Sequence, residues 1–113
     1  MTTDLSTIFW GPHFWSMYHI YAGTYPIVPT PIIAEYARLF IRGIPFTLPC
    51  SMCANHAFAY IQYIHQADPN LDNIVNSREN MITFFIDFHN AVNYRLGKPL
   101  LSMFDAKRKW SFG

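Results

Sequence analysis

Apolar residues recur every three to four positions along most of the chain, which is the spacing of one buried face of an α-helix. The first such stripe consists of Phe14, Trp15, Tyr18, His19 and Ala22. We expect its helix to begin at the run Trp10-Gly11-Pro12, because proline is tolerated in a first helical turn. Three prolines within residues 25–31 end this helix and predict an extended connection.

The next two helices are marked by their start and stop signals. Thr30 is predicted to cap a second helix with Pro31 at its first position, and this helix ends near Gly43. A third helix opens at residues 47–50 and is broken by the Asp-Pro-Asn run at residues 68–70. We expect a polar loop from there to the next helix.

Ser77 is predicted to cap a fourth helix, which stops at the Gly-Lys-Pro run of residues 97–99. A short fifth helical piece is expected over residues 101–110. Nowhere does an alternation of apolar and polar residues extend over the length of a strand. The pattern therefore predicts an all-α protein, a four-helix bundle with a short fifth helix at its C-terminal end.

Composition narrows the class of protein further. The 113 residues suffice for a single domain, residues 1–113. With 51% apolar and only 13% charged residues, the chain is not expected to be disordered. A net charge of +1 gives no basic surface that favours nucleic acid as a partner. The 18% of aromatic residues indicates a large interface or a flat, bulky ligand.

Two long stretches, residues 5–34 and 43–67, carry no charged residue. Both contain prolines and histidines, so neither is expected to span a membrane. The first residues lack the basic segment of a secretory signal and the arginines of a transit peptide. We therefore expect a cytosol-like location, with import without a cleaved signal as the alternative.

The motif Cys50-Ser-Met-Cys53 contains both cysteines of the chain. They could be small core residues, or a disulfide whose short loop adds little stability. Zinc would need two further ligands; His56 and His65 are available, but their spacing fits no familiar zinc motif. A redox pair is favoured, because the positive end of the helix dipole at a helix start stabilises a thiolate and lowers the cysteine pKa. The helical context argues against a thioredoxin, which needs βαβ units.

Polar groups lie one helical turn apart on three of the predicted helices, in the pairs Trp15/His19, Cys53/His56 and His89/Asn93. Each histidine taken alone is best explained as a core residue with a hydrogen-bond partner. Three such pairs on apolar stripes are costly to bury without a polar ligand. A flavin dinucleotide suits them, since its flat rings can stack on aromatic side chains and Lys98 can meet its pyrophosphate.

Three blocks of the sequence resemble the signature blocks of the Erv/ALR FAD-linked sulfhydryl oxidases, most closely the minimal versions of large cytoplasmic DNA viruses. Their order and spacing agree over roughly residues 10–99. The blocks are Trp10-Gly11-x3-Trp15-x3-His19, Leu48-Pro49-Cys50-x2-Cys53-x2-His56, and His89-Asn90-x-Val92-Asn93-x2-Leu96-Gly97-Lys98-Pro99.

The resemblance implies an FAD-dependent thiol oxidase that converts two protein thiols and O2 into a disulfide and hydrogen peroxide. Cys50 would exchange with substrate thiols, and Cys53 would pass electrons to the flavin. No GxGxxG fingerprint is present, so FAD is expected at the mouth of the bundle. The residues expected to bind it are Gly11, Trp15, His19, His56, His89, Asn90, Val92, Asn93, Lys98 and Trp110, and no metal is expected.

The chain also departs from its relatives. Many have a long-range disulfide where this chain has Ile86 and a residue near Met103, so packing is expected to replace that link. Many also have a shuttle cysteine pair, for which this chain has no further cysteines. The substrate thiol would then meet Cys50 directly, or a small thiol-carrier protein would act between them.

Further expectations concern assembly and setting. Relatives dimerise through their bundles, and Tyr36, Phe40 and Ile41 are expected to form an exposed apolar patch, so a homodimer is expected. The host cytoplasm or a viral assembly site is the expected location, with the mitochondrial intermembrane space as the alternative. Two other functions stay open: a non-enzymatic helical adaptor that binds zinc or thiols, and a disulfide reductase or isomerase that works without flavin.

Overall fold

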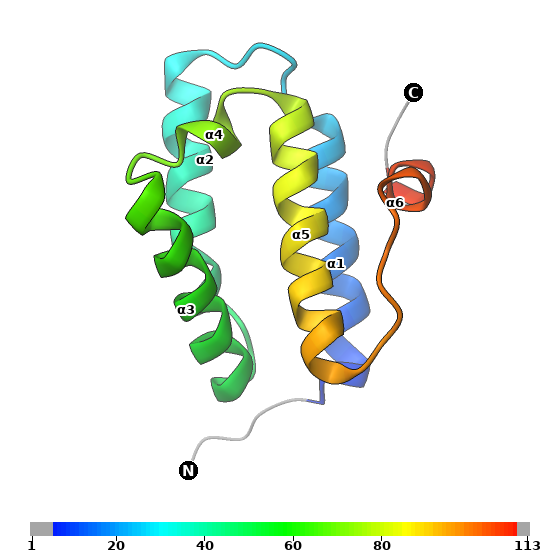
Figure 1. Ribbon diagram of the computed structural model, residues 1–113. Coiled ribbons are helices and arrows are strands. Elements are labelled where there is room, and N and C mark those ends of the chain that lie inside the picture. Colours follow the sequence, from blue (N-terminus) through cyan, green and yellow to red (C-terminus); the bar gives the residue numbers. More distant parts are fainter. Residues whose placement is uncertain (1–5, 111–113) are drawn as a thin grey trace.

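The computed structural model describes residues 6–110, which contain helices and connecting segments but no β-strand. The four long helices are α1 (Thr7–Thr24), α2 (Pro31–Gly43), α3 (Ser51–Ala67) and α5 (Arg78–Leu96) (Figure 1). The short elements are the 3-10 turn η1 (Ile44–Phe46), α4 (Asp72–Val75) and α6 (Met103–Trp110). The predicted all-α bundle of four helices with a short C-terminal helix is confirmed.

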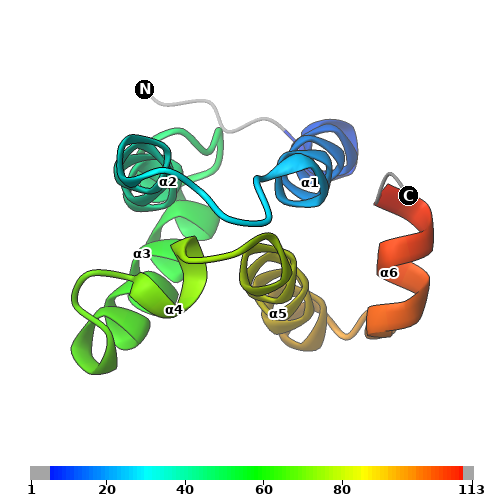
Figure 2. The same cartoon turned by 90° about the horizontal axis from the view of Figure 1, so that it is seen from above.

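Viewed along the bundle, the long helices occupy four corners, and α6 lies outside them (Figure 2). Helix α6 contacts both α1 and α5, while α4 packs against α5 and α2. The apolar stripe of each long helix faces the centre. Phe85 of α5 and Ile41 of α2 are among the most deeply buried side chains there. This arrangement leaves the C-terminal segment beside the α1–α5 pair.

Side-chain caps account for where the helices begin. The hydroxyl oxygens of Ser6, Thr30, Ser77 and Ser102 each accept a hydrogen bond from a backbone N–H two or three residues later. Such bonds satisfy donors that have no partner inside the helix. At the other end of α5, Gly97 adopts a left-handed conformation with φ of 70°, which suits glycine and stops the helix.

Helix α1 begins at Thr7, so the prediction that it starts at Trp10-Gly11-Pro12 is wrong. Pro12 lies inside the helix instead. Proline there removes one N–H from the helical ladder and crowds the carbonyl of Ile8, four residues earlier. The Ser6 cap, at 3.2 Å from the Ile8 nitrogen, offsets part of this cost by fixing the first turn.

The polar loop expected after α3 is also wrong, because the short helix α4 forms there. Leu71, Ile74 and Val75 are buried in the core, and Leu71 adopts a left-handed φ of 54° that is unusual for leucine. The guanidinium of Arg38 on α2 donates to the Asn70 carbonyl at 2.7 Å and to the Asp72 carboxylate at 2.9 Å. Contacts with α2 and α5 therefore fold a segment whose local sequence favours a loop.

The expected apolar patch on α2 is only partly present. Ile41 is fully buried and Phe40 is half-buried against the core, so neither belongs to an exposed patch. Tyr36 does remain exposed, and Ile32 and Leu39 flank it on the same side of the helix.

No helix among residues 6–110 has the length and apolar character needed to cross a lipid bilayer.

Candidate functional site

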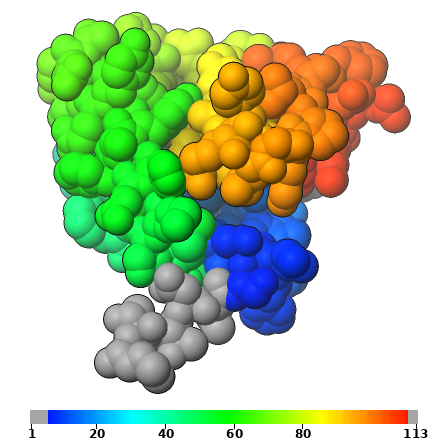
Figure 3. Space-filling model, turned by 60° about the horizontal axis from the view of Figure 1, so that its bottom comes forward, coloured from blue at the N-terminus to red at the C-terminus, as the bar shows by residue number. Residues whose placement is uncertain are grey.

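A cavity of about 830 Å³ lies between α1, α3 and α5 and extends to the segment that follows α5. In the view that brings the bottom of the bundle forward, α3 forms one side of the surface, while α1 and the segment after α5 form the other (Figure 3). The cavity wall contains these residues singled out from the sequence: Gly11, Trp15, Cys50, Cys53, His56, His89, Val92, Asn93, Lys98 and Trp110. His19 and Asn90 are not part of that wall.

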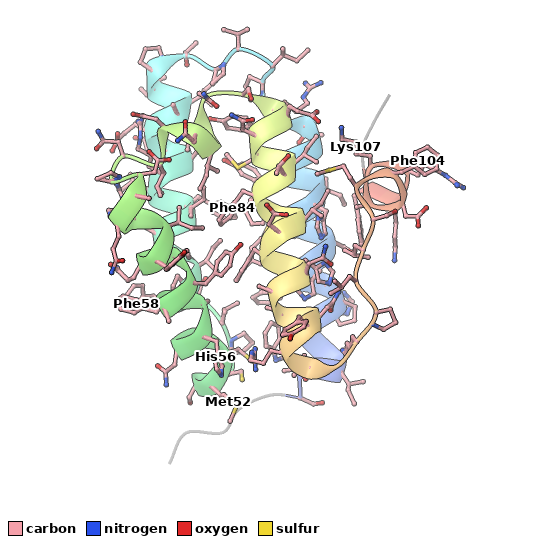
Figure 4. All side chains as sticks on the ribbon, viewed as in Figure 1. Met52, His56, Phe58, Phe84, Phe104 and Lys107 are labelled. Atoms are coloured by element: carbon pink, nitrogen blue, oxygen red, sulfur yellow. The ribbon has the colours of Figure 1, made fainter. Side chains whose placement is uncertain are left out.

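The two cysteines stand at the start of α3, at the same end of the helix as Met52 and His56 (Figure 4). Cys50 is the N-cap residue, and its Sγ accepts a hydrogen bond from the backbone N–H of Cys53 at 3.3 Å. Both are free thiols and half-buried. The helix start thus holds the two sulfurs close together on the cavity wall, with an N–H group directed at the first.

Burial, together with the side-chain hydrogen bond from Cys50, raises the pKa of the Cys53 thiol to about 11. The positive charge of Arg95 acts in the opposite direction. The lowered cysteine pKa expected from the helix start is therefore wrong for Cys53 in this dithiol form. The cost of removing a charged sulfur from water exceeds the benefit of the helix dipole at this position.

A stack of rings from three helices closes the side of the cavity opposite α3. His89 of α5 lies flat on Trp15 of α1, with ring centres 3.9 Å apart and planes within 2°. His19 of α1 stacks on Trp110 of α6, with ring centres 4.1 Å apart. A hydrogen bond of 2.8 Å joins His19 Nε2 and His89 Nδ1 and connects the two stacked pairs. His19 therefore supports the cavity wall through His89 and Trp110.

Asn90 of α5 holds the backbone of the segment that follows the helix. Its side-chain Nδ2 donates to the Leu101 carbonyl at 2.9 Å, and its Oδ1 accepts from the Leu101 N–H at 2.7 Å. Asn90 does not line the cavity, and its contact with a cofactor stays a prediction. The side chain holds the segment that leads to α6, and so places Trp110 beside His19.

Packing is only one of the interactions that hold the C-terminal segment, where many relatives were expected to have a long-range disulfide. Ile86 is buried in the core as expected, but Met103 is exposed. Polar contacts hold the C-terminal segment as well: the Asn90–Leu101 pair, and an ion pair of 2.6 Å between Lys107 of α6 and Glu79 of α5. Ala106 of α6 is buried against the bundle.

Three cations line the cavity: Arg95, Lys98 and Lys109. Among residues 6–110 no aspartate or glutamate lines it, so this part of the chain gives the wall a positive charge. Arg95 was missed from the sequence, although it lies three residues after Val92 and three before Lys98, and so on the helix face that leads to Lys98. A phosphate-bearing ligand would find an anion site here.

The rest of the wall is mainly aromatic and apolar. Tyr60 of α3 stacks on Phe88 of α5, with ring centres 5.4 Å apart, and both line the cavity. The cavity volume lies within the range of about 300–1,000 Å³ that is usual for small-molecule and cofactor sites. Among residues 6–110 no group of three or more His, Cys, Asp or Glu side chains is placed to hold a metal ion. The wall suits a ligand with flat rings and negative charge, in reach of the cysteine pair.

Comparison with known proteins agrees with this description. Residues 12–111 match the Erv1/Alr family. The chain is 60% identical over 110 residues to a protein of Invertebrate iridescent virus 6 named as the FAD-linked sulfhydryl oxidase 347L, covering 97% of this chain and 99% of that protein. It is 34% identical over 98 residues to the FAD-linked sulfhydryl oxidase of an African swine fever virus isolate (Pig/Kenya/KEN-50/1950), covering 87% and 76%.

A solved structure gives the same result for the fold. The crystal structure of the FAD binding domain of Erv1 from Saccharomyces cerevisiae is similar with a TM-score of 0.79 and 26% sequence identity. The match covers 96% of this chain and 94% of that one.

Proposed function

The chain belongs to the Erv1/Alr family, and we propose that it is an FAD-dependent thiol oxidase that forms disulfide bonds in protein substrates. The observation that carries this function is that Cys50 and Cys53 share one cavity with stacked aromatic rings and three cations. A cysteine pair alone exchanges disulfides; an oxidase also needs an electron acceptor. The cavity provides a site for one beside the thiols. Residues 1–113 then act as a single FAD-binding domain.

The residues of the wall fit FAD, which has two flat ring systems joined by a pyrophosphate. Aromatic side chains offer faces for stacking, Asn93 is a buried polar group on the wall, and Lys98 with Arg95 and Lys109 would meet the phosphates. The residues that would hold FAD are Gly11, Trp15, His56, His89, Val92, Asn93, Lys98 and Trp110, with His19 and Asn90 as supports. When bound, FAD accepts the two electrons of the cysteine pair and passes them to O2.

Cys50 is the cysteine that exchanges with substrate. When the pair is oxidised, a substrate thiolate attacks the Cys50 sulfur, the Cys50–Cys53 bond breaks, and Cys53 leaves as a thiolate. A second substrate thiolate attacks the substrate sulfur of this mixed disulfide and releases the substrate disulfide together with the Cys50 thiolate. The Cys53 N–H, 3.3 Å from Cys50 Sγ, donates to that sulfur as its negative charge develops.

Cys53 is the inner cysteine, which delivers the electrons inside the cavity. The charge of Arg95 favours its thiolate and opposes the effect of burial, which keeps the thiol protonated in the reduced pair. The balance over one cycle is two substrate thiols plus O2 to one substrate disulfide plus hydrogen peroxide. The two thiol protons end on the peroxide.

The substrate is a protein thiol, which reaches Cys50 directly or through a small thiol-carrier protein, because the chain has only two cysteines. The location that goes with the viral relatives is the host cytoplasm or a viral assembly site, with the mitochondrial intermembrane space as the alternative. A homodimer would use the exposed face of α2 formed by Ile32, Tyr36 and Leu39.

The visible spectrum of the purified protein, followed by oxygen uptake with dithiothreitol, tests the proposed function. We expect a yellow protein that consumes O2 and releases hydrogen peroxide in equal amounts. A colourless protein with stoichiometric zinc would support the adaptor instead. Disulfide exchange without oxygen uptake would support the flavin-free isomerase.

A further inference from the structure

We propose that the outward face of α3, continued by Phe46 of η1, docks the substrate polypeptide and selects cysteines with apolar neighbours. The face is defined by Phe46 and Phe58 and is called the α3 face below. This inference rests on the proposed thiol oxidase function and adds to it the chemical class of the substrate segment.

The α3 face exposes two aromatic side chains to solvent. The exposed fractions are 77% for Phe46 and 45% for Phe58. Phe46 and Phe58 contact each other edge to face, with ring centres 6.1 Å apart. Phe58 lies on the side of α3 that faces away from α5 (Figure 4). Grouped exposed apolar side chains of this kind are typical of interaction sites.

The α3 face also lacks charge. Residues 43–67 contain no Asp, Glu, Lys or Arg, although the chain has 15 such residues, eight basic and seven acidic. A charged side chain of a docked segment would lose water there without gaining an ion-pair partner. An apolar side chain would lose contact with water favourably. The surface therefore favours apolar over charged neighbours of the substrate cysteine.

Cys50 determines what occupies this face. Disulfide exchange brings a substrate sulfur into contact with Cys50 Sγ, so the chain on either side of the substrate cysteine must lie against nearby surface. Phe58 is eight residues from Cys50, roughly 12 Å along the helix axis at 1.5 Å per residue. An extended segment advances about 3.3 Å per residue, so its third or fourth residue from the cysteine reaches Phe58.

The experiment measures oxygen uptake by the flavin-loaded enzyme with dithiothreitol and with two synthetic dithiol peptides. The peptides are identical except at the third and fourth residues before and after the cysteine pair, which are leucine in one and glutamate in the other. The test variant is Phe46→Ser with Phe58→Ser, since neither residue lines the flavin cavity. The matched control is Tyr94→Ser, which removes an exposed aromatic ring from α5 that does not line the cavity.

We expect the unmodified enzyme to prefer the leucine peptide by roughly ten-fold in kcat/KM. The double variant should lose roughly five- to ten-fold with the leucine peptide, mainly through KM, and stay within about two-fold with dithiothreitol and the glutamate peptide. Flavin content and helicity of the double variant should stay unchanged, and so should every rate of Tyr94→Ser.

Equal rates with both peptides, or a double variant that keeps the preference, would overturn the docking proposal in an enzyme that oxidises dithiothreitol. A double variant that changes oligomeric state by sedimentation would also overturn it, because the α3 face would then join two copies. A flavin-free chain without dithiothreitol oxidation would remove the proposed function itself, and the docking proposal with it.

Discussion

His19 of α1 and His89 of α5 share a hydrogen bond of 2.8 Å between Nε2 and Nδ1, buried between the rings of Trp15 and Trp110. Burial, together with the positive charge of Lys109, lowers the pKa of each histidine to about 4. Neither ring is charged at neutral pH, so one donates and the other accepts. This pair connects the bundle to the helix that carries Trp110.

The pair predicts a loss of stability in mild acid. The folded pKa of about 4 lies below the ordinary value of 6.5, so the unfolded chain binds more protons between these pH values. The free energy of unfolding should therefore fall as pH falls from about 6.5 to 4. Thermal melting across this range checks it. The variant His89→Gln, which cannot take up that proton, should show a shallower loss, whereas an equal slope would contradict the assignment.

Replacement of either cysteine should abolish disulfide formation in proteins. Cys53→Ser should abolish turnover with dithiothreitol and with protein thiols, because no pair remains beside the cavity. Cys50→Ser should also lose disulfide formation in proteins while it keeps FAD, since the wall of the cavity is intact. Oxygen uptake and flavin content measure the two effects. Full dithiothreitol oxidation by Cys53→Ser would contradict its role.

Asn90→Ala should weaken the hold on the C-terminal segment. The change removes two hydrogen bonds to the Leu101 peptide, and it should lower the free energy of unfolding by about 1–3 kcal/mol. Urea unfolding of the FAD-loaded protein measures this, and flavin should dissociate more readily as Trp110 loosens. Tyr94→Ala, on an exposed position of the same helix, is the control and should change little. If Asn90→Ala and Tyr94→Ala have the same free energy of unfolding, the hydrogen bonds between Asn90 and Leu101 do not stabilise the C-terminal segment.

His89→Leu with Asn93→Leu separates a cofactor wall from an ordinary core. If the two side chains only pack, their replacement by leucine should be neutral or stabilising. If they hold FAD, the loss of hydrogen bonds and of the ring on Trp15 should weaken FAD binding by roughly two to four powers of ten. The protein should then purify pale, inactive and still helical by circular dichroism. Unchanged flavin content after dialysis would show that FAD binds elsewhere.

Local chemistry made the helices readable from the sequence. Thr30, Ser77 and Gly97 act on backbone groups within a few residues, so their effect does not depend on the rest of the fold. The same holds for the start of α3 at Cys50. The family resemblance, carried by motifs of fixed spacing, is likewise contained in the sequence, and the comparisons confirm it.

Tertiary structure decided what depends on neighbours distant in the chain. Helix α4 forms because Arg38 donates hydrogen bonds to this segment and the core buries its apolar side chains, although its local sequence favours a loop. Ile41 is buried because its side of α2 faces the same core. The pKa of Cys53 follows burial, which local spacing does not report. Asn90 belongs to the same motif as His89 and Asn93, but its side-chain amide forms hydrogen bonds with the backbone of Leu101. A motif names the residues of a site, whereas desolvation and competition for hydrogen bonds, set by the packed chain, determine which of them reach the cavity.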